Sequence, residues 1–178
     1  DTDIAANDKL GVINFQAPDE GAGTDAILVA AGIEAVSEGD FSASSNATSL
    51  VFKTGASEAA AEKMRVDSAG RVLIGTTTEG QGSADDLTIA TSGNTGITIR
   101  TGTSSEGAIY FSDGTSGAAE YEGMLAYDHS SNFLRIITNH AEAARFDSSG
   151  NLLVGYSSSN GSYKLQVNSQ IFATNATV

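Results

Sequence analysis

Short runs in which apolar and polar residues alternate recur along the chain and predict β-strands. In a strand, side chains two residues apart lie on the same face. Clusters of Gly, Ser, Asp and Asn separate the runs, as is typical of turns. The clearest runs cover residues 11–15, 50–54, 107–111, 123–127 and 133–139. The pattern predicts an all-β chain with little helix.

Other segments carry a weaker or mixed pattern. Residues 25–36 are rich in Ala, but Gly32 interrupts the run and strands flank it, so we expect a strand there. Residues 57–64 are the best helix candidate, with about two turns and Ser57 as the N-cap. Residues 18–21 are predicted as a turn. Further short strands are predicted at residues 87–89, 97–99, 163–168 and 171–173.

One stretch of the chain occurs twice. The first copy reads EKMRVDSAGRVLIG at residues 62–75, and the second reads EAARFDSSGNLLVG at residues 142–155. Asp67 and Asp147 can accept a backbone hydrogen bond within a turn, and Gly70 and Gly150 can take the positive φ of a three-residue hairpin loop with a bulge. Each copy is therefore predicted to be a β-hairpin with a fixed register.

The duplication extends beyond the hairpin. The pattern Gly-x-Ile-x-Phe occurs at residues 11–15 and again at residues 107–111. The offset is 96 there (11 to 107) and 80 at the hairpin (62 to 142), so the second copy has lost residues, most simply in its loops. We therefore divide the chain into a first repeat at 1–78, a second at 79–156 and a C-terminal segment at 157–178.

Composition favours thin, regular β-structure. Among 178 residues there are 20 Gly, one Pro and no Trp, and 40% are hydrophobic. Leu73 and Leu153 point away from the apolar residues that flank them, so their strands are apolar on both faces and are expected to be buried on both faces. Because a thin repeat cannot supply that burial alone, we expect stacked repeats or several chains.

Charge and residue types exclude several classes of function. The net charge of −13 argues against binding to nucleic acid or to an anionic membrane surface. No Cys is present, and no apolar run approaches the roughly 20 residues of a transmembrane helix. His129 and His140 fit loop residues better than metal ligands, and no calcium-loop pattern accompanies the acidic residues. No metal or cofactor is expected.

With the repeats identified, the chain resembles the shaft or distal part of a tail-fibre protein of tailed bacteriophages. The resemblance rests on residues 63–77 and 144–155, on the two Gly-x-Ile-x-Phe segments, on residues 111–115 and on residues 163–168. It implies an elongated homotrimer of interleaved strands, with a triple β-helix, β-prism or sandwich-like beads as possible forms. It also implies a structural, extracellular virion component that contacts tail or baseplate proteins and a host surface glycan or protein. In such fibres a self-cleaving chaperone domain often follows a segment like residues 163–168, so the resemblance implies a mature, processed end near residue 178.

Candidate binding residues come from the aromatics of the second half. Tyr121 and Tyr156 have loop-like neighbours and are the best candidates for an exposed, sugar-stacking ring. No catalytic residue is predicted. The alternatives are a glycan-depolymerising tailspike, for which Asp113 with Glu120 or Glu122 is the one local carboxylate cluster, and a secreted bacterial adhesin.

Overall fold

The computed structural model describes residues 3–17, 21 and 23–171. Within this part the chain is all-β, with one short 3₁₀ helix and no α-helix, which confirms the predicted class. It divides into two compact units, Asp1–Gly96 and Ile97–Val178, each described by itself. The predicted turn at residues 18–21 and most of the predicted strand at 171–173 lie outside the described residues.

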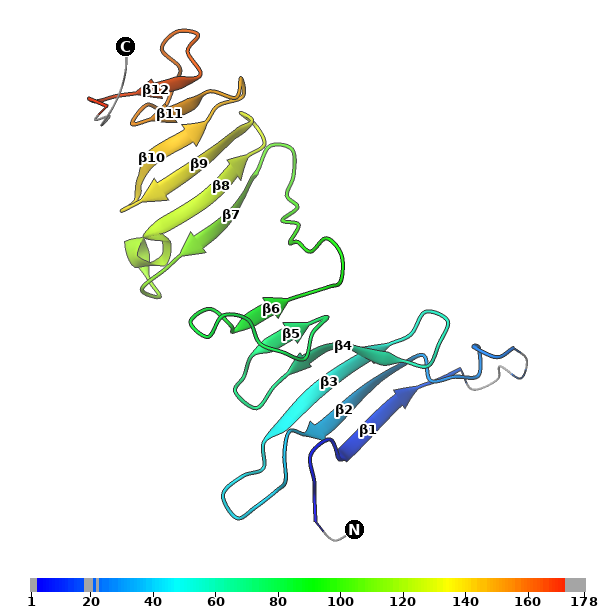
Figure 1. Cartoon of the computed structure of the whole chain (residues 1–178). Helices are drawn as coiled ribbons and strands as arrows, with labels where there is room; N and C mark the ends of the chain where they lie inside the picture. The colour runs from blue at the N-terminus through cyan, green and yellow to red at the C-terminus, as the bar shows by residue number, and fades with distance from the viewer. Residues whose placement is uncertain (1–2, 18–20, 22, 172–178) are drawn as a thin grey trace, which may run out of the picture. The chain divides into compact units, whose positions relative to one another are not determined.

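The first unit is one six-stranded sheet with its strands in chain order (Figure 1). Neighbouring strands are antiparallel except for the last pair, which is parallel. The strands are β1 (Lys9–Phe15), β2 (Ala31–Ser37), β3 (Thr48–Thr54), β4 (Ala61–Val66), β5 (Val72–Ile74) and β6 (Leu87–Ile89).

The second unit repeats this topology, again with an antiparallel meander that ends in a parallel pair. The 3₁₀ helix η1 (Gly117–Tyr121) lies between its first two strands. The strands are β7 (Glu106–Phe111), β8 (Gly123–Asp128), β9 (Phe133–Thr138), β10 (Ala141–Phe146), β11 (Leu152–Val154) and β12 (Leu165–Val167).

The two sheets correspond strand by strand, and the second copy is shorter in its hairpin loops, as predicted. In the first unit the three hairpin loops are residues 16–30, 38–47 and 55–60. The corresponding loops of the second unit are shorter and are residues 112–122, 129–132 and 139–140. The last of these is a two-residue turn, Asn139-His140, with φ of 48° and 63°. Two positive φ values match the right-handed twist of a tight hairpin, so this loop is as short as a hairpin allows.

The predicted hairpin turn is present in both copies. Asp67 Oδ1 accepts hydrogen bonds from the backbone N–H groups of Ala69 (3.0 Å) and Arg71 (2.9 Å). Asp147 Oδ1 accepts the same bonds from Ser149 and Asn151, both 2.9 Å. Gly70 and Gly150 have φ of +86° and +72°, the left-handed region that glycine adopts without strain.

The parallel pair at the end of each sheet requires a crossover connection, and that connection covers one face. In the first unit, Thr88 Oγ1 accepts a hydrogen bond from the N–H of Gly80 in the crossover. In the second unit, the Gln166 side chain bonds Ser159, Asn160 and Tyr163 of the equivalent loop. Leu73 and Leu153 are next to these anchors in register and are 1% and 0% exposed. The predicted burial is therefore present on one face and is supplied by the same unit, whereas Ile74 and Val154 on the other face are 36% and 37% exposed.

Two local predictions are wrong. Residues 57–64 are not a helix, because Ala61–Val66 forms β4 between β3 and β5. A helix of about two turns is marginal in water, whereas pairing on both edges satisfies the backbone of this segment. Residues 97–99 do not form the predicted strand. The neighbouring predicted strand at residues 87–89 does form, because it pairs with β5.

The predicted boundary between repeats, after residue 78, falls inside the crossover from β5 to β6. The strand at Leu87–Ile89 pairs with β5 and belongs to the first sheet. The two compact units divide after Gly96.

The turn glycine is testable by one substitution. Gly70→Ala is expected to lower the free energy of unfolding by about 1 kcal/mol, because a Cβ is unfavourable at positive φ. A steric clash does not contribute to this loss, since a Cβ at Gly70 would meet no atom within 4 Å. Urea unfolding at fixed protein concentration measures the change.

Gly82→Ala is the matched control, because Gly82 also has open space around its Cβ position but no positive φ. Equal stability losses in the two variants would contradict the role assigned to the turn.

Candidate functional site

One face of the first sheet is apolar across all six strands. The strand register places one residue of each strand in a single cross-strand row: Ile13, Ile33, Phe52, Met64, Ile74 and Ile89. The adjacent row on the same face reads Gly11, Ala35, Leu50, Val66, Val72 and Leu87. Side chains in such rows are neighbours, so the rows form one continuous surface, the apolar face of the first sheet.

The second sheet has the same apolar face. Its two rows are Ile109, Leu125, Ile136, Ala144, Val154 and Val167, and Gly107, Tyr127, Leu134, Phe146, Leu152 and Leu165. The Ile99 side chain lies against Gly107, since a Cβ atom added to Gly107 would be 3.2 Å from it. The two faces therefore repeat in composition as well as in topology.

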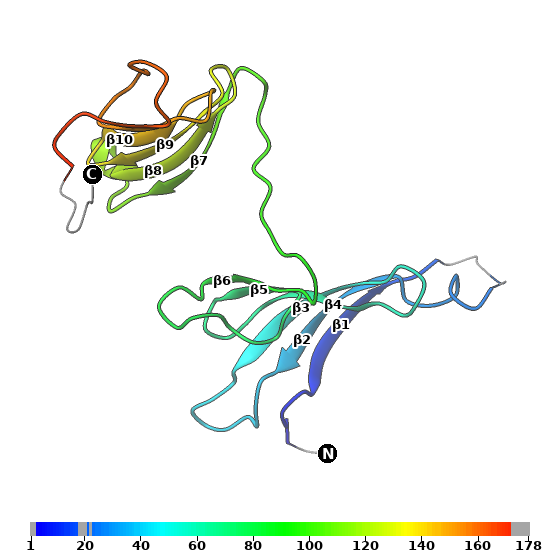
Figure 2. The same ribbon diagram turned by 45° about the horizontal axis from the view of Figure 1, so that its top comes forward.

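The described residues of each unit leave most of its apolar face uncovered. Each unit is a single sheet layer with loops along it (Figure 2). Ile13 is 58% exposed, Ile109 is 48% exposed, and none of the residues in the four rows is buried. The buried hydrophobic strand residues lie on the opposite faces: Val51, Leu73, Met124, Ala126 and Leu153. Soluble single chains rarely expose continuous apolar surfaces of this kind, which mark interfaces.

The opposite faces carry the charges. Glu34 is buried, and its Oε1 accepts hydrogen bonds from Lys9 Nζ and Lys53 Nζ, both at 2.8 Å. The bonds from Lys53 and Lys9 hold the pKa of Glu34 below its ordinary value, although burial raises it. Glu62 and Arg65 form an ion pair nearby at 2.6 Å. In the second sheet, Glu142 with Arg145 is the equivalent pair.

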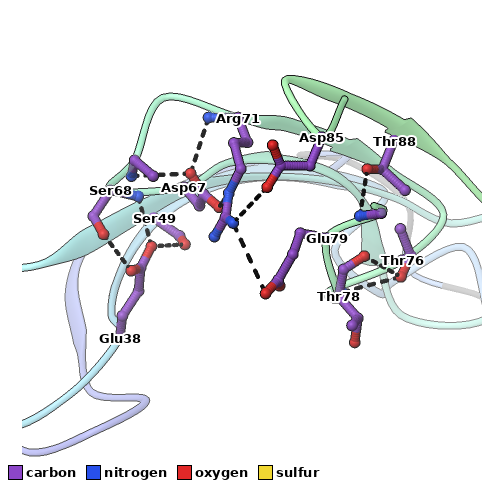
Figure 3. A network of polar contacts seen from close by, with 12 residues as sticks. Glu38, Ser49, Asp67, Ser68, Arg71, Thr76, Thr78, Glu79, Asp85 and Thr88 are labelled. Atoms are coloured by element: carbon purple, nitrogen blue, oxygen red, sulfur yellow. Dashed lines mark hydrogen bonds and ion pairs between the residues drawn. The ribbon is translucent and has the colours of Figure 1, made fainter. Parts of the chain in front are cut away.

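The first hairpin turn is the centre of a polar network (Figure 3). The Arg71 guanidinium bonds Asp67 at 2.7 Å and Asp85 at 3.0 Å. Burial alone would raise the pKa of Asp67, but the hydrogen bonds and charge of Arg71 outweigh it, and the pKa lies below its ordinary value. Glu38 accepts hydrogen bonds from Ser49 and Ser68, which ties the β2–β3 loop to the turn.

The second turn lacks this network. Asn151 takes the place of Arg71, and its side-chain amide donates to Asp147 Oδ2 at 2.9 Å. The backbone bond from Asn151 is the main cause that lowers the pKa of Asp147. The turn geometry is thus common to both units, whereas the guanidinium belongs to the first. Asp67, Gly70, Asp147 and Gly150 occupy the structural positions expected of them.

The predicted binding tyrosines lie in separate places. Tyr121 is the last residue of η1 and is 45% exposed, with its ring edge-on to His140 at 5.5 Å. Tyr156 begins the second crossover and is half-buried. The structure does not bring these two rings together. Two other tyrosines are more exposed than either: Tyr110 at 57% and Tyr163 at 74%.

The remaining candidates are the two histidines and the carboxylates Asp113, Glu120 and Glu122. Glu122 contacts His140 Nε2 at 3.2 Å, and His129 packs edge-on to Tyr127. No group of three or more potential metal ligands occurs among the described residues. The described residues also contain no helix with the length and apolarity needed to cross a bilayer.

Sequence reasoning missed the continuity of the apolar faces, because the cross-strand register decides it. It also missed the Lys9–Glu34–Lys53 group, whose members come from three different strands. The only available signal was alternation within each strand, which shows that a strand has two faces but not which residues of other strands join them.

Comparison with known proteins gives a distant structural likeness. No protein family and no curated protein sequence matches the chain. The similar solved structures include two of the carboxy-terminal domain of the bacteriophage T5 L-shaped tail fibre, both at 13% sequence identity. The structure that includes an intramolecular chaperone domain has a TM-score of 0.41, and the likeness covers 62% of its chain. The other structure has a TM-score of 0.40, and the likeness covers 90% of its chain. Both likenesses cover 99% of this chain.

The lowered pKa of Asp67 predicts an acid-dependent loss of stability. A carboxylate with a lowered pKa stabilises the fold above its ordinary pKa of about 3.9, and this contribution is lost as the pH falls through the lowered value. Asp67→Asn is therefore expected to lower the free energy of unfolding by about 1–3 kcal/mol at pH 7, and the difference from the unaltered chain should shrink below about pH 4.

Urea unfolding from pH 7 to pH 3 measures this difference. Asp86→Asn is the control, because the Asp86 side chain is exposed and makes no hydrogen bond to another described residue. A gap between Asp67→Asn and the unaltered chain that stays constant over the whole range would contradict the role assigned to this carboxylate.

Proposed function

We propose that this chain is a structural segment of a trimeric phage tail fibre that attaches the virion to a host cell surface. The observation that carries the proposal is the pair of uncovered apolar faces, one on each sheet. A surface of this extent on a chain with net charge −13 is consistent with permanent contact between copies.

Self-association explains the exposure better than contact with an unrelated partner. The same face is apolar in both repeats, so one arrangement of copies covers both sheets by the same contacts. Each large aliphatic side chain contributes about 1.5–3 kcal/mol when it leaves water. The proposed assembly therefore completes the cores that the single sheets lack.

The number three comes from the resemblance of residues 63–77 and 144–155 to fibre repeats. Three sheets whose apolar faces turn toward a common axis enclose a core between them and leave the charged faces outward. Two sheets face to face are the alternative packing, and the mass of the particle distinguishes them.

Attachment is assigned to the outward surface. The charged faces and the loops remain accessible in such an assembly, and exposed tyrosines among polar residues suit contact with a surface glycan. Tyr121 and Tyr156 are proposed receptor contacts, and tail or baseplate proteins are the proposed neighbours within the virion.

A pair of adjacent substitutions tests the assembly. Ile109 and Tyr110 are 48% and 57% exposed and point to opposite faces of edge strand β7. Ile109→Glu places a carboxylate on the apolar face, so we expect it to weaken association by at least a hundredfold, since an unpaired buried charge costs several kcal/mol. Tyr110→Glu, on the charged face, should leave association unchanged.

Sedimentation of the unaltered chain should give a particle near three times 18.1 kDa. Dissociation by Ile109→Glu and not by Tyr110→Glu supports the proposal. A monomer of the unaltered chain at micromolar concentration, or equal effects of the two substitutions, overturns it.

A further inference from the structure

The charged face of the first sheet contains an open hollow of about 360 Å³. Five charged residues line it: Lys9, Glu34, Lys53, Glu62 and Arg65. Val51 and Ala60 add apolar atoms, and Asn7 adds an amide. A polar rim over an apolar base, in a volume at the lower end of small-molecule sites, is a common form of ligand site.

Two irregularities in the strands direct charged residues into this hollow. The register of β1 with β2 shifts between Lys9 and Gly11, so Lys9 lies on the charged face instead of the apolar face that the two-residue period would give. The register of β3 with β4 shifts between Phe52 and Lys53. Because of this shift, Glu62 also lies on the charged face instead of the apolar face. Bulges of this kind often re-aim side chains beside functional sites.

The local charge is opposite to that of the whole protein. Lys9, Lys53 and Arg65 supply three positive charges, and Glu34 and Glu62 supply two negative charges, which leaves an excess of one positive charge. The chain as a whole carries −13. An anionic ligand that the rest of the surface repels is therefore attracted to this place.

The two ammonium groups have donors to spare. Lys9 Nζ and Lys53 Nζ lie 2.8 Å from the same oxygen of Glu34, and that is the one hydrogen bond each makes to a described residue. An ammonium group has three donors, so both can also reach one external oxygen. Glu34 is buried beneath them and holds both in place.

The second unit has no equivalent group, although its fold is the same. By register, Ala126 stands where Glu34 does, and Ile137 stands where Lys53 does. The first bulge is also absent, since β7 pairs with β8 without a shift. The hollow is thus an addition to the repeat rather than a requirement of it.

We propose that this hollow binds an acidic saccharide, with Lys9 and Lys53 on a sugar carboxylate and with Asn7, Glu62 and the apolar base on the ring. The inference rests on the proposed function in one respect, because the assembly turns this face outward. The site itself lies within one unit and needs no residue of another copy.

Titration calorimetry on the full chain with tetragalacturonate as the probe tests the proposal. Maltotetraose, a neutral tetrasaccharide, should not bind. Lys9→Gln should weaken binding about tenfold, while Glu34→Gln should strengthen it, because the ammonium groups lose their competing carboxylate. Lys63→Gln removes one positive charge from the same sheet but not from the hollow, and it should change nothing.

Several outcomes overturn the proposal: no binding of tetragalacturonate at millimolar concentration, equal weakening by Lys9→Gln and Lys63→Gln, or inorganic phosphate binding as tightly as the saccharide. Light scattering on the same samples separates this test from the proposed function. A monomer that binds the saccharide would refute the assembly alone, and a trimer that does not bind it would refute the site alone.

Discussion

The structure depends on one constraint, which is that each unit is a single β-sheet whose described loops bury strand side chains on one face. Here the crossover before the last strand of each unit covers the charged face beside β5 or β11 and buries Leu73 and Leu153. The other face, which holds most of the large aliphatic and aromatic side chains, is left largely exposed by the described residues of its own unit. Each sheet is therefore half a core, and the proposed assembly supplies the other half.

The hairpin turn makes this arrangement repeatable. In both units an aspartate fixes the loop through backbone hydrogen bonds, and a glycine at positive φ ends it, so β4 with β5 and β10 with β11 have the same register. Loops elsewhere differ in length without any change to the rows of apolar residues. Variation such as the Lys9–Glu34–Lys53 group is thereby confined to the charged face, where it leaves the apolar face unchanged.

Much of this could be predicted from the sequence, because it is local. Asp67 and Gly70 specify their turn through bonds within a few residues, and the duplicated motif indicated the repeat. The helix predicted at residues 57–64 failed because pairing with β3 and β5 outweighs the helix propensity of Ala. The hollow was out of reach, since the bulges that re-aim Lys9 and Glu62 arise from pairing between strands and leave no mark within either strand.

The central claim, that other copies cover the apolar faces, is tested most directly by the reactivity of single cysteines. The chain has no cysteine, so each introduced thiol reports on one position. Ile13 and Asn14 are adjacent in edge strand β1, point to opposite faces and are both exposed in the single chain. We predict that Ile13→Cys reacts with a maleimide at least about tenfold more slowly than Asn14→Cys. Equal rates would contradict the account.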